Sequence, residues 1–414
     1  MSCTADYRVA SPNSSPPRRA DVRASTRPLE STVDLNDVAR GDGYLFVRDG
    51  VGIAGRGVAR RLPADTAVAE LAAITHDDAS GGRAGPVALG SVPFVPGGSS
   101  ELVVPAVTVR KCADGSQWLT IIDDADPSGI DDPRAIKPTS SSFRVAPLTP
   151  IDRYCDAVRQ AREAVRREDL VKAVIARQII VESERPIDVH AVLLRLRASF
   201  GSSYRYSIDG FIGASPELLV AVDGDVITSH PLAGTTPRSG DPETDRRLAE
   251  RLIASMKDQI EHRVVIDVVH DTLLPWCSYL DWEPEPSVVP VANVQHLGTR
   301  IEGQLGEPRP DVMTLVRALS PTPALGGHPR EEALRLIAAV EGFDRGPYGG
   351  AVGWVDAHGN GTWAVAIRCA QLSDDRRVAT LTAGGGIVAD SDIDSELAET
   401  QAKFQAMLSA LIRV

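Results

Sequence analysis

The chain has 414 residues, of which 43% are hydrophobic, so it is long enough for one large domain or two ordinary ones with a sizeable core. Its 44 basic and 56 acidic residues give a net charge of −12, which argues against a nucleic-acid partner. No stretch approaches the roughly eighteen consecutive apolar residues of a membrane span, and the beginning of the chain lacks the apolar core of a signal peptide. We therefore expect a cytoplasmic protein without a membrane partner.

The cysteines are odd in number, widely spaced and without a CxxC pair. This pattern predicts reduced thiols, with neither a disulfide framework nor a zinc site. They are Cys3, Cys112, Cys155, Cys277 and Cys369.

Residues 1–38 are rich in Ser, Pro and Arg and lack hydrophobic periodicity, which predicts a disordered tail. A transit peptide is a weaker alternative, because acidic residues are present. From Gly43 to Ile122, short apolar runs alternate with turns and predict strands; they include YLFV, VGIAG, ELVVPAVTV and WLTII. The Asp- and Pro-rich stretch 123–150 predicts a surface connection that leads into a helix at 151–167.

The rest of the chain mixes strands and helices without a regular βαβ repeat, which favours an α+β architecture over a doubly wound sheet. A strand is expected at 173–182 and a helix at 187–198. Later strands are expected at 211–222, 351–355, 363–372 and 378–383. A helix that carries Glu396 closes the chain.

A long helical pattern from Asp241 to Leu274 lies between these segments. It predicts one continuous helix with an apolar stripe made of Leu248, Leu252, Met256, Ile260, Val264 and Val268. Glu261 falls on the edge of that stripe.

Glu396, Glu399 and Lys403 follow one another at spacings of three and four residues, so their side chains share one face of the last helix. That face borders an apolar stripe, and carboxylates that emerge from packed structure need a strong partner such as a divalent cation. Mg²⁺ fits because it prefers oxygen ligands. The alternative is that Glu261, Glu396 and Glu399 are solvated helix charges, paired at i,i+4 with Lys257 and Lys403.

From about Ile151 to its end, roughly two thirds of its length, the chain resembles the chorismate-utilising enzymes, which include anthranilate synthase component I, and within them is most similar to isochorismate synthases. The motifs that carry the resemblance are KAVIARQ, GASPELL, PLAGTTPR, KDQIEH, VQHLGTRIEG, SPTPALGGHP, YGGAVGW, AVAIRCA, TAGGGIVADSD and ELAETQAK. The resemblance implies an α+β fold in which large antiparallel sheets, flanked by helices, enclose a buried magnesium and chorismate site. It also implies a single catalytic domain over 39–414, with a variable β-rich part at 39–150 and a motif-bearing part at 151–414.

For the metal, the resemblance implies Glu261 and Glu399 as magnesium ligands, with Glu396 nearby through water, and the metal would hold the ring carboxylate of chorismate. For the substrate, it implies contacts from Arg368, Lys403 and Tyr348 to the carboxylates. The amides of Gly384, Gly385 and Gly386 would assist, since glycine lets main chain approach an anion closely. An ordinary tight turn would also explain the glycines, and a surface charge would explain Arg368.

The implied reaction replaces the C4 hydroxyl of chorismate by a water oxygen that arrives at C2, which needs a base and an acid. Lys172 and Glu217 match these roles. Lys172 lies in an apolar strand, where desolvation lowers the affinity of a lysine for protons and lets it take one from water. Glu217 begins another apolar run, and burial should raise its proton affinity so that it can protonate the leaving hydroxyl. The alternatives are a solvated edge-strand lysine and a turn glutamate.

Three positions favour this reaction over related ones. Amine-using relatives lack a lysine at the position of Lys172, and the aminodeoxychorismate branch has a nucleophilic lysine where this chain has Ala233. Salicylate synthases, which go on to eliminate pyruvate, usually have threonine at the position of Ala324. We therefore predict isochorismate as the product. Salicylate synthase is the alternative, followed by anthranilate synthase component I and an inactive chorismate-binding scaffold.

Two further motifs supply candidate substrate contacts. His296 matches a family histidine near the C4 hydroxyl of the substrate, although a packing role would also explain it. Thr235, after Gly234, could orient the substrate or the acid through its hydroxyl, although a simple turn would explain it too. The lack of coiled-coil heptads makes a monomer the expectation. Nothing in the sequence indicates whether the product enters siderophore, salicylate or menaquinone biosynthesis.

Overall fold

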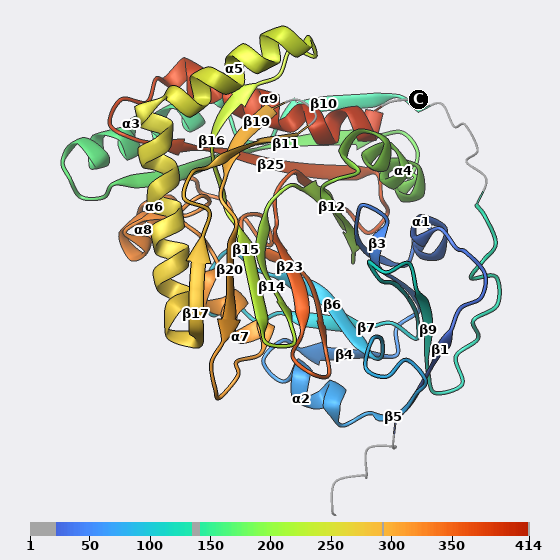
Figure 1. Cartoon of the computed structure of the whole chain (residues 1–414). Helices are drawn as coiled ribbons and strands as arrows, with labels where there is room; N and C mark the ends of the chain where they lie inside the picture. Colours follow the sequence, from blue (N-terminus) through green and yellow to red (C-terminus); the bar gives the residue numbers. More distant parts are fainter. Residues whose placement is uncertain (1–21, 135–140, 292–293, 413–414) are drawn as a thin grey trace, which may run out of the picture.

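The computed structural model describes residues 22–134, 141–291 and 294–412, in which two large sheets carry most of the chain (Figure 1). The first sheet has 13 strands, and nearly all of its neighbours pair antiparallel. Its order is β10 (Phe143–Pro147), β11 (Lys172–Ser183), β25 (Val378–Ile387), β24 (Cys369–Leu372), β13 (Phe211–Ser215), β12 (Tyr204–Ile208), β2 (Tyr44–Arg48), β3 (Val51–Arg56), β8 (Val107–Lys111), β9 (Gln117–Ile122), β1 (Arg23–Pro28) and β5 (Thr75–Asp78), and β21 (Gly327–His328) pairs with β11.

The second sheet has nine strands and a third has three. The second runs in the order β17 (Cys277–Trp282), β20 (Ile301–Leu305), β15 (Val226–His230), β14 (Leu218–Asp223), β23 (Gly361–Val365), β22 (Ala351–Asp356), β6 (Val87–Val92), β7 (Glu101–Val104) and β4 (Arg60–Pro63). The third runs in the order β16 (Leu232–Pro237), β19 (Val294–Gly298) and β18 (Ser287–Pro290). Strands from the variable part and from the motif-bearing part therefore share both large sheets.

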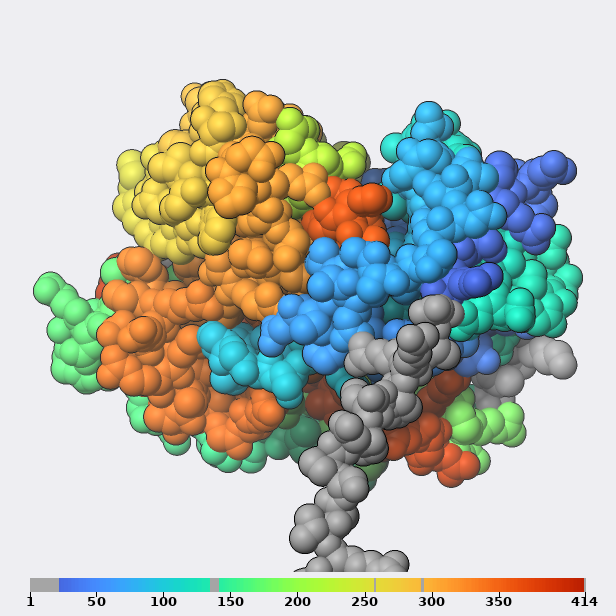
Figure 2. Space-filling view, turned by 90° about the horizontal axis from the view of Figure 1, so that it is seen from below, coloured from blue at the N-terminus to red at the C-terminus, as the bar shows by residue number. Residues whose placement is uncertain are grey.

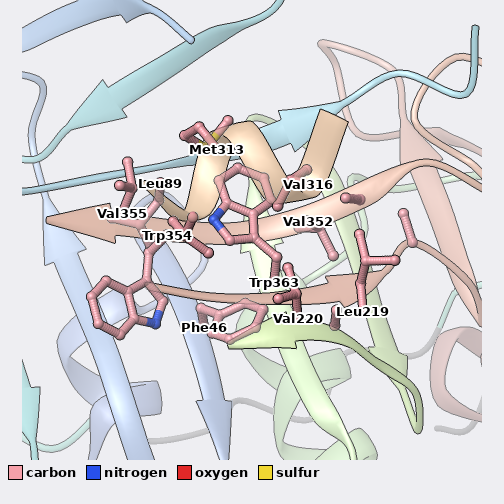
Figure 3. Packing of buried hydrophobic residues seen from close by; sticks show 14 of the residues in the cluster. Phe46, Leu89, Leu219, Val220, Met313, Val316, Val352, Trp354, Val355 and Trp363 are labelled. Atoms are coloured by element: carbon pink, nitrogen blue, oxygen red, sulfur yellow. The ribbon is translucent and has the colours of Figure 1, made fainter. Parts of the chain in front are cut away.

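Helices cover the sheets and help to bury their apolar faces. They are α1 (Leu35–Ala39), α2 (Ala67–Ala72), α3 (Ile151–Arg166), α4 (Val189–Phe200), α5 (Pro242–Ala254), α6 (Met256–Leu273), α7 (Val312–Leu319), α8 (Arg330–Val340) and α9 (Ile393–Ile412), with a short 3-10 turn η1 (Leu274–Trp276). Helices α3 and α9 lie along β11 and β25 (Figure 1). Phe46 of β2 belongs to the same buried cluster as Trp363 of β23 and Met313 of α7, which lie close together in Figure 3. One core therefore joins the two large sheets.

Several expected elements are confirmed within two residues of their predicted ends: the helices α3 and α4 and the strands β11 and β22. The strand predicted at 378–383 is longer, because β25 continues through the glycine run to Ile387. The α+β class is also confirmed.

Two predicted strands, 211–222 and 363–372, are each wrong as single strands. The first divides at Pro216, which lacks the N–H that a strand interior needs, into β13 of the first sheet and β14 of the second. The second divides before β24 at Arg368, whose φ is +52°, in the left-handed region. Both segments are apolar on either side of the break, so composition alone concealed the change of sheet. The breaks place Glu217 and Arg368 where the chain passes between the two sheets.

The long helix predicted from Asp241 to Leu274 is also wrong, because it divides at Ser255. Ser255 has an extended conformation, and its hydroxyl accepts a hydrogen bond from the Asp258 amide at 3.3 Å, so it caps α6. The break changes the buried face: Met256 is 73% exposed and Ile260 59%. The apolar residues that α6 buries are Val265, Ile266, Val269 and Leu273.

Disorder was predicted for residues 1–38. Residues 1–21 lie outside the described residues, and for residues 22–38 the prediction is wrong. Strand β1 pairs with β9 and β5, and the hydroxyls of Thr26 and Thr120 lie 2.8 Å apart between β1 and β9. Asp34 caps α1 by accepting the Asn36 amide at 2.9 Å. The Ser- and Pro-rich composition hid a strand next to the edge of the sheet, which buries only Ala24 and Thr26. The stretch 123–150 was expected to be a surface connection only. It also contains the strand β10, which pairs with β11.

Four of the five cysteines lie in described segments, and all four are free thiols, as predicted. No helix in the described segments combines the length and the apolar character needed to cross a membrane.

Candidate active site

One cavity collects most of the predicted site residues, although they are scattered over more than 200 positions of the sequence. It lies where β11, β25, α9, α6, β16, β19 and the two sheet-to-sheet junctions meet. The predicted residues that line it are Lys172, Glu217, Ala233, Gly234, Thr235, Glu261, His296, Ala324, Tyr348, Arg368, Gly384, Gly386, Glu399 and Lys403. Gly385 and Glu396 are not part of this lining.

Lys172 begins β11 and is only 4% exposed, so it is not a solvated edge-strand lysine. Its Nζ lies 2.6 Å from Oε1 of Glu261, which reaches the cavity from α6. Space for this pair comes from Gly386, where a Cβ would lie 2.6 Å from Lys172 Cε and 3.1 Å from Glu261 Oε1. The sequence predicted both residues but not their pairing.

Glu217 lies at the junction after Pro216 and is 2% exposed, so it is not a solvated turn residue. Burial raises the pKa of its carboxyl to about 7, although a hydrogen bond from the Leu232 amide at 3.4 Å and the nearby cations Arg368, Lys172 and Lys403 oppose the shift. Near neutral pH the group can therefore hold a proton and release it. The burial expected from the apolar run that follows Pro216 is confirmed.

Arg368, at the second junction, forms a buried pair with His296 of β19. Arg368 donates from its terminal nitrogen to His296 Nε2 at 3.1 Å. The other ring nitrogen, Nδ1, lies 3.0 Å from the Gly234 carbonyl oxygen and 3.1 Å from Thr235 Oγ1. Because a carbonyl only accepts hydrogen bonds, this network assigns the ring hydrogen to Nδ1. Burial, followed by the charges of Arg368 and Lys403, lowers the pKa of His296 to about 3, so the ring is neutral.

Glu399 and Lys403 lie one turn apart on α9, and the predicted shared face is confirmed. Lys403 Nζ donates to Glu399 Oε1 at 2.6 Å and to the Gly384 carbonyl oxygen at 2.8 Å. Burial raises the pKa of Glu399, but the adjacent ammonium of Lys403, together with His296 and Arg368, outweighs that effect and the pKa is lowered. Glu399 is therefore a carboxylate at neutral pH.

The glycine run is part of β25 and not a tight turn. Gly384, Gly385 and Gly386 pair with Ala176, Ile175 and Val174 of β11. Gly384 and Gly386 line the cavity. Gly385 instead makes room for Glu396, since a Cβ there would lie 2.6 Å from Glu396 Oε2 and 3.9 Å from Glu399 Oε1.

Glu396 is buried beside the cavity wall. Its Oε1 accepts a hydrogen bond from Ser391 Oγ at 2.8 Å. Glu396 and Glu399 thus lie beside Gly385 and Glu261 lies beside Gly386, two successive residues of β25 that face opposite sides of the strand. Carboxylate oxygens are the ligands that Mg²⁺ prefers, so the donor set fits this ion. In the described segments, however, no three acidic, His or Cys side chains already have the arrangement of a metal centre. Lysines pair with two of these carboxylates, Glu261 and Glu399.

Tyr348 and Ala324 also line the cavity. Tyr348 is buried, and burial raises the pKa of its hydroxyl, which therefore stays protonated and can donate a hydrogen bond. The sequence analysis did not single out the apolar lining residues Val174, Leu325 and Ile367. Each lies within two residues of a predicted site residue in the sequence, and this proximity could have identified them.

The chain is similar to known proteins in sequence and in fold. A family described as "Chorismate binding enzyme" matches residues 73–412. The chain is 35% identical over 341 residues to isochorismate synthase DhbC of Bacillus subtilis, a match that covers 80% of this chain and 82% of that protein. It is 33% identical over 356 residues to isochorismate synthase EntC of Escherichia coli, covering 82% and 85%. The solved structure of the menaquinone-specific isochorismate synthase MenF of Escherichia coli has the same fold, with a TM-score of 0.81 at 24% identity over 95% of each chain.

Proposed function

The chain belongs to the chorismate-binding enzymes, and we propose that it is an isochorismate synthase, which isomerises chorismate to isochorismate. The observation that carries the proposal is that Lys172 and Glu217 line one buried cavity together with the cations Arg368 and Lys403. The names of the relatives support the same reaction. An inactive scaffold is disfavoured because all the ionisable groups that the reaction needs meet at one place.

The proposed chemistry adds one water and removes another. Lys172 accepts a proton from the water whose oxygen bonds to C2 of the ring. The ring double bonds shift, and the C4–oxygen bond breaks as Glu217 donates its proton, so that the hydroxyl leaves as water. Lys172 then holds the proton that Glu217 has lost, and transfer between them or through solvent restores both groups.

Cations in the cavity suit the two carboxylates of chorismate. Arg368 and Lys403 are held by His296 and by the Gly384 carbonyl, respectively, so both are fixed before the substrate arrives. Charge-assisted hydrogen bonds from such groups are stronger than neutral ones. Tyr348 adds a hydroxyl donor, and Gly384 and Gly386 bring main chain close to the substrate.

We propose Glu261 and Glu399 as the protein ligands of a magnesium ion, with Glu396 supporting them from behind Gly385. When bound, the ion would hold the ring carboxylate of chorismate and balance its charge. Two direct carboxylates suit Mg²⁺, which usually keeps several waters. In the structure Lys172 and Lys403 pair with Glu261 and Glu399, so a bound ion would replace the two lysines as the partner of these glutamates and leave Lys172 free to act as the base.

Product analysis tests the proposal most directly. Purified protein incubated with chorismate and Mg²⁺ should form isochorismate, detected by chromatography, and the Lys172→Ala variant serves as the matched blank. Accumulation of salicylate and pyruvate would instead favour salicylate synthase, despite Ala324 in the cavity wall. Formation of anthranilate from ammonia and chorismate would contradict the assignment of water as the nucleophile.

A further inference from the structure

Strand β11, which carries Lys172 at its start, has a gap along one edge. On that edge β21 pairs with Lys172 and Ala173, and β10 pairs with residues 179–183. The Val174 amide still donates to the Gly326 carbonyl oxygen at 3.0 Å, but among the described residues no strand on this side provides a partner for the Val174 carbonyl or the Ala176 amide. Backbone groups buried in such a gap need other partners, because an unpaired one carries a desolvation cost.

Two charged side chains fill the gap. Glu341 Oε1 accepts a hydrogen bond from the Ala176 amide at 2.7 Å, and Arg345 donates to the Val174 carbonyl oxygen at 2.7 Å. One acceptor and one donor, two residues apart along β11, reproduce what a neighbouring strand would present. Glu341 and Arg345 also bind each other, with Arg345 Nε 2.8 Å from Glu341 Oε2, and both side chains are 1% exposed.

The same guanidinium reaches two other walls of the cavity. Arg345 donates to the Leu325 carbonyl oxygen at 2.9 Å and lies over the ring of Phe94, 4.1 Å from its centroid. Its own carbonyl accepts the Tyr348 amide at 3.1 Å. Val174, Leu325 and Tyr348 all line the cavity, whereas Glu341 and Arg345 do not. The pair therefore joins three walls without access to a bound substrate.

A buried ion pair is weak evidence for stability, because desolvation of two charges offsets most of their attraction. Well-packed apolar residues would fill the same volume but would leave the Val174 carbonyl, the Ala176 amide and the Leu325 carbonyl without the partners that the pair supplies. The charged pair therefore adds fixed partners in the one stretch of this edge of β11 that no strand covers, which apolar residues would not do.

We propose that Glu341 and Arg345 are positioning residues that replace a missing strand beside β11 and so hold Lys172 at a fixed place relative to the wall formed by Ala324 and Leu325. This inference rests on the proposed function, because the pair would affect the reaction only by positioning Lys172, the proposed base.

The test is the double variant Glu341→Gln/Arg345→Met, which removes both charges and leaves neither buried alone. We expect a KM for chorismate within about threefold of the wild type, because Arg368 and Lys403 are untouched. The kcat should fall by about tenfold to a hundredfold, since a small misplacement of a catalytic group is enough for such a loss. Arg205→Met is the matched control: Arg205 is also buried, bonds to Asn36 at 2.9 Å and lies outside the cavity. Its kcat should stay within about twofold whatever its melting temperature does.

Equal kcat in the double variant and the wild type would overturn the inference, and so would equal losses in the double variant and Arg205→Met. Should the double variant fail to fold, Arg345→Lys keeps the charge but cannot reach all the partners, and it should still lose kcat with little change in KM. A wild-type protein that forms another product from chorismate contradicts the proposed function alone, because kcat can be compared on that product.

A wild-type protein that turns over no chorismate also contradicts the proposed function alone. The pair is then tested by amide hydrogen exchange, which should become faster in residues 172–178 of the double variant and stay unchanged in residues 218–223. Unchanged exchange in 172–178 would overturn the inference.

Discussion

Two regions contribute to the cavity with very different degrees of burial. The sheet wall, formed by β11, β25 and the two junctions, places Lys172, Glu217 and Arg368 where each residue is no more than 8% exposed. The α5–α6 arm, residues 242–273, packs on β16 and contributes Glu261, and its surface forms a lobe at one side of the molecule (Figure 2). The arm carries the exposed Met256 and Ile260, and the Glu261 side chain is 16% exposed. The groups proposed to move protons are thus buried in the sheet wall, whereas a proposed metal ligand lies on a less enclosed element.

If this contrast is functional, the largest effect should come from the sheet wall. Lys172→Ala should lower kcat by about a thousandfold or more, because loss of a general base typically removes a factor of 10² to 10⁴. Chorismate binding, measured by calorimetry, should stay detectable, since the cations remain. A variant with a near-normal rate would remove Lys172 as the base.

A second effect concerns the arm and α9 together. Glu261→Ala and Glu399→Ala should each raise the Mg²⁺ concentration needed for half-maximal activity by about tenfold or more, because each removes a proposed ligand. Direct Mg²⁺ binding, followed by calorimetry, should weaken in parallel. Glu302→Ala is a control on an exposed strand glutamate, and unchanged magnesium affinity in both site variants would contradict the metal assignment.

The acid should leave a signature in the pH dependence. Since Glu217 must donate a proton, and its pKa is raised to about 7, kcat/KM should fall as pH rises through about 7. Glu217→Gln should lose most of the activity and this alkaline fall with it. An identical fall in the residual activity of Glu217→Gln would assign the titration to another group.

The same residue links the buried wall to stability. A carboxyl with a pKa near 4.5 when unfolded and about 7 when folded favours the folded state fully at low pH, and that contribution is lost as pH rises from about 4.5 to 7. Glu217→Gln, which stays neutral, should therefore have a free energy of unfolding at pH 8 that is higher than that of the wild type by up to about 3 kcal/mol. Its melting temperature at pH 8 should be higher as well. Equal melting temperatures at pH 8 would argue that the carboxylate is well solvated.

The smallest effect is expected on the outer face of the arm. Met256→Gln and Ile260→Gln should change the free energy of unfolding by no more than about 0.5 kcal/mol and leave kcat unchanged, as surface substitutions usually do. Val265→Ala, on the buried face of α6, should cost about 1–3 kcal/mol in denaturant unfolding. A large loss from Met256→Gln would show that this face is covered in solution.

Sequence reasoning predicted which residues lie together in one cavity better than it predicted where the elements begin and end. Lys172 and Glu217 lie in or beside apolar runs, so their burial could be predicted, and the spacing of Glu399 and Lys403 gave their shared helix face. The junctions at Pro216 and Arg368 were missed because apolar residues continue on both sides while the strand changes sheets.

Other features depend on tertiary contacts that no local pattern records. Ser255 interrupts a helical pattern that would otherwise continue from α5 into α6. Glu341 and Arg345 have the i,i+4 spacing of ordinary surface pairs such as Arg246 and Glu250, and nothing in that spacing shows that one pair is buried and the other exposed. Glu261 was predicted as a metal ligand, but its bond to Lys172 joins residues 89 positions apart.

The two junctions have a consequence for how the protein matures. Because Glu217 and Arg368 both lie where the chain leaves one sheet for the other, neither sheet formed alone can assemble the pocket. Catalytic competence should therefore return late in refolding, after secondary structure has recovered and at the moment when the two layers dock.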